Sequence, residues 1–125
     1  MKIIKQTLLA AVVSVAAVGT AQAAVLTTGA LNREGTQHFH CTLANLNTKD
    51  LVIQNVEFID GVTGTVSIST GETTLGPGMS TNMIGTDTDN GYCRFTFKGS
   101  PKKVRAGMNV HNAVGDQVVA YLPAT

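Results

Sequence analysis

Two segments of this chain alternate between apolar and polar residues, and each places its cysteine on the apolar phase. The apolar residues are Phe39, Cys41 and Leu43 in the first segment, and Cys93, Phe95 and Phe97 in the second. Successive side chains of a β-strand point to opposite faces, so both cysteines are expected to face the interior. The chain contains no other cysteine. We therefore predict one disulfide, Cys41–Cys93, between two packed sheets.

The rest of the chain after residue 23 repeats this pattern of short alternating runs. Clusters rich in glycine, asparagine and aspartate separate the runs, and no helical period lasts for a dozen residues. Short strands at this spacing are typical of an antiparallel sandwich or barrel. We predict an all-β fold, a small antiparallel β-sandwich of seven or eight strands, near residues 25–31, 37–46, 51–60, 62–70, 79–85, 91–98, 103–112 and 116–123.

The predicted pairing of Cys41 with Cys93 resembles the inter-sheet disulfide of immunoglobulin-like sandwiches. The resemblance covers two strands and implies an immunoglobulin-like architecture. The chain departs from the family pattern in two ways. It has no tryptophan to pack on the bridge, and Gly91 stands where the family has a corner tyrosine, two residues before the second cysteine.

The N-terminus has the three parts of a secretory signal peptide. Lys2 and Lys5 precede an uncharged apolar run, and Ala21 and Ala23 then form an A-x-A cleavage site. We expect residues 1–23 to be the signal peptide and residues 24–125 to form a single domain. The protein would then be exported, to the periplasm, the cell surface or the medium.

The charge of the predicted mature chain is near neutral. Loss of Lys2 and Lys5 leaves seven basic residues against eight acidic ones. Such a balance does not favour a nucleic-acid binder. Residues 24–125 also contain no apolar run long enough to span a membrane, which takes about 20 residues. We therefore expect no nucleic-acid partner and no membrane span in the mature chain.

The three histidines form the candidate metal site. His38 and His40 share the outward phase of their strand, and His111 lies on the outward phase of segment 103–112. We predict that His38 and His40 are polar residues on a solvent-exposed face that binds no metal tightly. The alternative is a zinc or copper site, which needs the two strands to be neighbours so that the three imidazoles converge.

The second candidate site is basic. Arg94, Lys98, Lys102, Lys103 and Arg105 follow one another with no acidic residue among them. Because only residues 99–102 separate the two strands, we expect a hairpin that gathers these side chains into one ribbon. The ribbon and the sheet edges would then serve a protein partner or self-association. The alternative is a solvated edge with protective lysines.

Motifs for catalysis are missing from the sequence. There is no G-x-S-x-G, no glycine-rich phosphate loop and no H-E-x-x-H. Inward-facing cysteines also do not make reactive nucleophiles. We expect a small exported, non-catalytic binding or surface-structural module without a cofactor. The alternative is a periplasmic copper- or zinc-binding protein that uses His38, His40 and His111.

Overall fold

The computed structural model describes residues 23–85, 88–112 and 118–125. The predicted signal peptide, apart from Ala23, therefore lies outside the described residues. The described residues form strands β1 (Ala23–Thr27), β2 (Leu31–Asn32), β3 (His38–Asn45), β4 (Leu51–Asp60), β5 (Val66–Ser69), β6 (Thr73–Leu75), β7 (Ser80–Gly85), β8 (Asn90–Lys98), β9 (Val104–His111) and β10 (Val118–Pro123), with a 3₁₀ turn, η1, at Pro101–Lys103. None of the described segments is a helix of the length and apolarity needed to cross a membrane.

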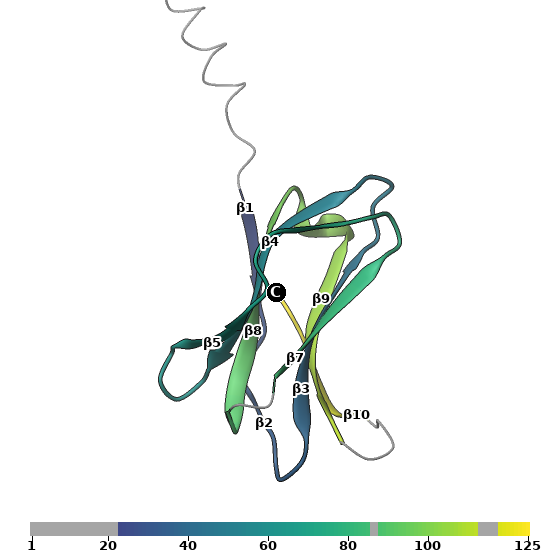
Figure 1. The fold of residues 1–125 in the computed structure, drawn as a ribbon. Coiled ribbons are helices and arrows are strands. Elements are labelled where there is room, and N and C mark those ends of the chain that lie inside the picture. Colours follow the sequence, from purple (N-terminus) through teal and green to yellow (C-terminus); the bar gives the residue numbers. More distant parts are fainter. Residues whose placement is uncertain (1–22, 86–87, 113–117) are drawn as a thin grey trace, which may run out of the picture.

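The strands form two antiparallel sheets that face each other (Figure 1). One has the order β1-β8-β4-β5, with β2 beside β8 and β6 beside β4, and is called the first sheet. The other, called the second sheet, has the order β10-β9-β3-β7. The predicted class, an all-β sandwich, is confirmed.

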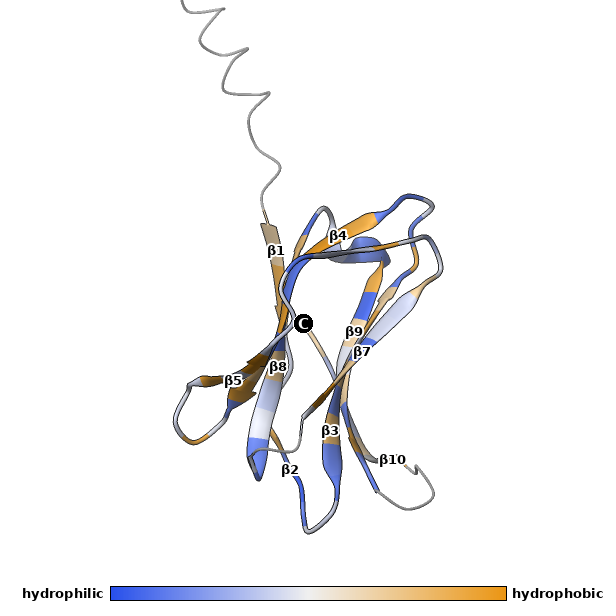
Figure 2. Ribbon diagram, in the orientation of Figure 1, coloured by the Kyte–Doolittle hydropathy of each residue, from blue (hydrophilic) through white to orange (hydrophobic). Residues whose placement is uncertain are grey.

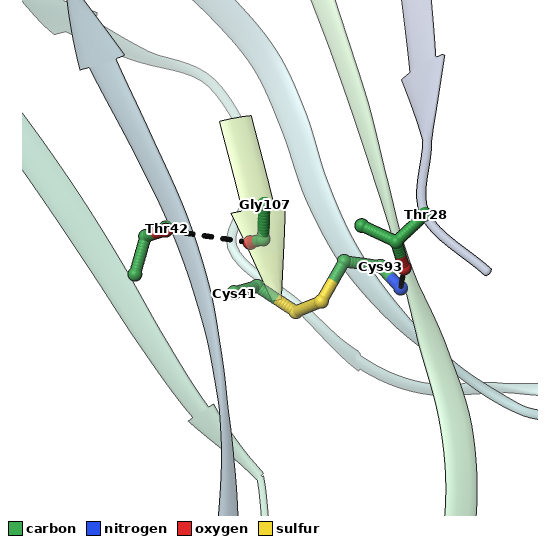
Figure 3. The surroundings of a disulfide bond; sticks show 5 residues. All are labelled: Thr28, Cys41, Thr42, Cys93 and Gly107. Carbon is green, nitrogen blue, oxygen red and sulfur yellow. Dashed lines mark hydrogen bonds between the residues drawn. A yellow bond between two sulfur atoms is a disulfide. The ribbon is translucent and has the colours of Figure 1, made fainter. Parts of the chain in front are cut away.

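The disulfide between Cys41 and Cys93 joins the two sheets through strands β3 and β8, as predicted (Figure 3). Both cysteines are buried, with Cα atoms 5.8 Å apart. Thr28 fixes the backbone beside the bridge, because its Oγ1 accepts a hydrogen bond from Cys93 N at 2.9 Å. The same residue interrupts the strand predicted at 25–31, which divides into β1 and β2.

Side chains from both inner faces fill the space between the sheets. Figure 2 shows polar and apolar positions alternating along β9, as expected for a strand with one face in the core. The rings of Phe39 and Phe58, one from each sheet, pack with centroids 4.7 Å apart. The fully buried core includes Phe39, Cys41, Leu43, Ile53, Phe58, Cys93, Phe95, Phe97, Met108 and Val110.

The link from β8 to β9 is a crossing between sheets, so the predicted hairpin is wrong. Strand β8 pairs with β1, β2 and β4, whereas β9 pairs with β3 and β10. Ser100 caps η1, with its side chain accepting a hydrogen bond from Lys102 N, and Pro101 occupies the first turn. This compact turn redirects the chain into the second sheet. In immunoglobulin constant domains the strand with the second cysteine and the strand that follows it share a sheet, so the resemblance holds for architecture and not for strand order.

Residue Asp60 explains why the strand predicted at 62–70 begins later. Its Oδ1 accepts hydrogen bonds from Val62 N at 2.8 Å and Thr63 N at 3.3 Å. A carboxylate that binds the backbone two and three residues onward forms a turn. Residues 61–65 are therefore a turn, and β5 begins at Val66.

The last residues of the chain connect the two sheets at one side of the sandwich. Ala124 N donates to Ala106 O in β9 at 2.9 Å, and Thr125 exchanges two backbone hydrogen bonds with Thr27 in β1. Figure 1 shows this final segment passing from β10 into the space between the sheets. The opposite edge of the second sheet, at β7, has no such cover among the described contacts.

Candidate functional site

The outward face of the second sheet carries the three histidines and Arg105, which are four of the eight polar residues that the sequence singled out. Strand β3 supplies His38, His40, Thr42 and Ala44, because Phe39, Cys41 and Leu43 point into the core. The register sets His38 opposite His111, and His40 opposite Asn109. On the other side of β3, Asn82 lies opposite Thr42. Strands β3, β7 and β9, which are distant in sequence, therefore all contribute to this face.

The three histidines come together on this face. We call His38, His40 and His111 the imidazole cluster. The ring centroids are 3.9 Å apart for His40 and His111, 4.7 Å for His38 and His40, and 6.0 Å for His38 and His111, with interplanar angles of 14–27°. The convergence expected if the two strands are neighbours is confirmed, since β9 lies beside β3.

The expectation that His40 faces solvent is wrong. Its relative exposure is 8%, because the neighbouring imidazoles stack on it and Asn82 covers its edge. Asn82 Nδ2 lies 2.9 Å from His40 Nδ1 and donates to it. That contact places the proton of a neutral His40 on Nε2, because only one ring nitrogen of a neutral imidazole is a donor. His38 and His111 are half-buried.

The stacking arrangement bears on the candidate metal site. An imidazole binds a metal through a lone pair in its ring plane, at about 2.0–2.1 Å for zinc. Nearly parallel rings stacked at 3.9 Å direct these lone pairs side by side instead of toward one point. Among the described residues, no group of three or more histidine, cysteine, aspartate or glutamate side chains is arranged to hold a metal ion. That these histidines bind no metal tightly stays a prediction from the sequence.

A hollow of about 390 Å³ extends over this face from the imidazole cluster to Arg105. We call it the sheet hollow. Small residues form its floor: Thr42 and Ala44 on β3, and Gly107 on β9. Thr42 lies opposite Gly107, and Ala44 lies opposite Arg105. Each strand residue advances by about 3.3 Å, so Arg105 and Asn109 lie about 13 Å apart along β9. The lining residues are His40, Thr42, Leu43, Ala44, Ser80, Thr81, Asn82, Arg105, Ala106, Asn109, His111 and Tyr121.

The ring of Tyr121 forms one side of the sheet hollow because residue 107 is glycine. Strand β10 places Tyr121 opposite Asn109, and its ring lies across Gly107. A Cβ atom on residue 107 would lie 2.7 Å from both Tyr121 Cε2 and Tyr121 Oη. Gly107 also provides the carbonyl that accepts the hydrogen bond of Thr42 Oγ1, at 3.4 Å (Figure 3). The phenol is thus held over the floor, beside Arg105.

The five basic residues of the predicted ribbon do not lie on one face. Arg94, on β8, belongs to the first sheet and Arg105, on β9, to the second, because the chain crosses between the sheets after Lys98. Lys102 and Lys103 lie in the connecting turn η1. The expected side-by-side arrangement is therefore wrong, and a role of these residues in partner binding stays a prediction.

The arginines differ in what they contact. Arg94 makes a bidentate pair with Glu57, with Nε–Oε1 and Nη2–Oε2 distances of 2.9 and 3.1 Å, and the hydrogen bond to Glu57 raises the pKa of the guanidinium. Arg33 lies 3.5 Å from Asp89. Within residues 23–85, 88–112 and 118–125, Arg105 has no carboxylate at ion-pair distance. Its side chain is exposed at the end of the sheet hollow.

Sequence reasoning missed several residues of this site. Tyr121, Asn82 and Asn109 are ordinary polar positions when each strand is considered alone. They meet because β10 and β7 lie on either side of the β9–β3 pair. The outward phase of each strand was the one available signal, and it gives the face of a residue but not its neighbours.

Comparison of the chain with protein-family models, with curated proteins and with solved structures found no match.

Proposed function

We propose that residues 24–125 act as an exported, non-catalytic binding module, with the sheet hollow as its ligand site. The observation that carries this proposal is the hollow itself. Its volume of about 390 Å³ falls within the range of about 300–1,000 Å³ that small-molecule sites occupy. Hydroxyl, amide, imidazole and guanidinium groups surround it, which suits a small polar ligand.

Binding is favoured over catalysis by the chemistry of these groups. Both cysteines form the disulfide, so neither thiol is available as a nucleophile. The four strands of the second sheet carry no aspartate or glutamate, so they supply no carboxylate that would orient the imidazoles of the hollow as a general base for a nucleophile. The lining supplies hydrogen bonds and one positive charge.

Export is supported by the signal-peptide pattern and by the disulfide, because disulfides persist in oxidising compartments. We expect cleavage after Ala23, so that the mature protein begins at Ala24. Intact-mass measurement of protein recovered from the periplasm or medium tests this. An exported protein that retains residues 1–23 would contradict this cleavage site. As a control, a variant with bulky residues at Ala21 and Ala23 should not be cleaved and should keep residues 1–23.

Amide chemical shifts test the sheet hollow as a ligand site. We expect that titration with four small polar probes (glucose, glucuronate, benzenesulfonamide and benzenesulfonate) shifts backbone amides of β3, β9 and β10 for at least one probe. Ala44→Leu should abolish these shifts, because a larger side chain on the floor occupies the space between Ser80 and Arg105. A matched control is Val66→Leu, at an exposed position of the first sheet.

The outcome is decisive in both directions. Shifts confined to the second sheet and lost in Ala44→Leu support the proposal. No shift with any of the four probes at millimolar concentration, or shifts that persist unchanged in Ala44→Leu, would overturn it. The free energy of unfolding of Ala44→Leu should stay within about 0.5 kcal/mol of the parent value, as is usual for substitutions on an outward face. Its denaturation midpoint should therefore stay close to that of the parent.

A further inference from the structure

The sheet hollow has an uneven distribution of charge, and this distribution indicates the kind of ligand it takes. Strands β3, β7, β9 and β10 carry no acidic residue along their entire length. The same strands carry Arg105, which lines the hollow. A concave surface whose strands carry a guanidinium and no acidic residue attracts anions.

The environment of Arg105 strengthens this argument. A guanidinium presents donors in a planar fork that matches carboxylate, phosphate or sulfate oxygens. Arg94 and Arg33 each have a carboxylate within the chain, at Glu57 and Asp89 respectively. Arg105 has none among the described residues, and it is an exposed residue that lines the hollow. Its donors are therefore available to an anion from outside.

The neighbours of Arg105 add donors in the same place. The hydroxyl of Tyr121 lies over Gly107, two residues along β9 on the same face as Arg105. The amide of Asn82 and the hydroxyl of Thr42 belong to the adjacent row of the sheet. Because Thr42 donates its hydrogen to Gly107 O, its oxygen serves a ligand as an acceptor. These groups can bind the polar body of a ligand whose charged group lies on Arg105.

We propose that the sheet hollow binds a small organic anion, with its carboxylate, sulfate or phosphate group on Arg105 and its body along the floor toward Asn109 and the imidazole cluster. The proposal rests on the function proposed above and adds the chemical class of the ligand. The length of about 13 Å between Arg105 and Asn109 suits a molecule larger than an inorganic ion and shorter than a polymer segment.

Two probe pairs test the charge requirement, because each pair differs in charge and little in shape. The pairs are benzenesulfonate with benzenesulfonamide, and glucuronate with glucose. We expect the anion of each pair to bind at least about 10-fold more tightly than its neutral partner, measured by the same amide-shift titration at pH 7 in low salt. Arg105→Gln should reduce the affinity for the anions by about 10-fold and leave the neutral probes unchanged.

Lys98→Gln is the matched control, because Lys98 is an exposed cation on the first sheet. It removes the same net charge and should leave the affinity unchanged. Gly107→Ala provides a second, charge-neutral variant: it displaces the Tyr121 ring and should weaken both anions while Arg105 is retained. Circular dichroism before each titration verifies that the variants are folded.

The possible results separate this inference from the proposed function. If neutral and anionic probes bind in the hollow equally well, or if Arg105→Gln and Lys98→Gln weaken the anions equally, the anion inference is overturned and the ligand site stands. If none of the four probes binds there, both proposals fall. Preference for the anions that is lost in Arg105→Gln alone supports both. Binding only of an acidic protein or of a longer polyanion would contradict the small-ligand class.

Discussion

Replacement of both Cys41 and Cys93 by alanine is expected to lower the free energy of unfolding by about 2–5 kcal/mol. The bridge spans a sequence separation of 52 residues, for which the chain-entropy model gives about 4 kcal/mol. It also ties together β3 and β8, two inner strands that belong to different sheets and do not pair with each other. Since domains of this size have about 5–15 kcal/mol of stability, the loss is a large share of the total.

Denaturant unfolding of the double variant, monitored by circular dichroism, measures this change. The parent protein unfolded in the presence of a reductant provides the control and should show a similar loss. A denaturation midpoint equal to that of the oxidised parent would mean that packing alone holds the sheets together. Labelling of the denatured, unreduced parent with a thiol reagent should detect no free cysteine.

Phe58→Ala is expected to have an effect of similar size, about 3–5 kcal/mol. Phe58 is 1% exposed, and its ring crosses from the first sheet to contact Phe39 in the second. The same ring fills the space above Gly91, where a Cβ atom would lie 2.2 Å from Phe58 Cζ. Truncation therefore leaves a cavity between the Gly91 backbone and the Phe39 ring, and the atoms of the paired strands around it cannot move in to fill it.

The matched control for this prediction is Val62→Ala, at a turn residue that is 83% exposed. It should change the free energy of unfolding by less than about 0.5 kcal/mol. Thermal unfolding of both variants gives the comparison, since 1 kcal/mol corresponds to about 4–8 °C in a domain of this size. Equal shifts in the two variants would contradict the central place of Phe58 in the core.

Alternation predicted the inward and outward residues of β3 and β8, and hence the disulfide, because the two-residue period is local. The sequence does not determine where the link at residues 99–103 leads the chain. A link of this length suits either a hairpin or a crossing between sheets, and the choice depends on which strands lie free to pair with β9. The separation of Arg94 from Arg105 follows from that choice.

The candidate site was predictable to a similar extent. The outward phase of His38, His40 and His111 was evident, but the stacking of their rings depends on the register between β3 and β9. The sheet hollow depends further on Gly107 and Tyr121, which are 14 residues apart and meet through the β9–β10 pairing. Side-chain periodicity carries no information on such pairings.

Substitutions in β3 are expected to have two different effects, depending on the face of the strand on which they lie. Its odd-numbered residues, Phe39, Cys41 and Leu43, hold the sandwich together, and its even-numbered residues, His40, Thr42 and Ala44, line the sheet hollow. Because the core fixes the backbone from behind, we expect the partly exposed Thr42 and Ala44 to tolerate substitution. His40 is 8% exposed and stacks on His111, so it is a packed position. If the sheet hollow is the ligand site proposed above, a library randomised at Thr42, Ala44, Arg105 and Asn109 should yield folded variants with altered ligand preferences. The ligand could then change by substitution on one side of β3 while the core on its other side is kept.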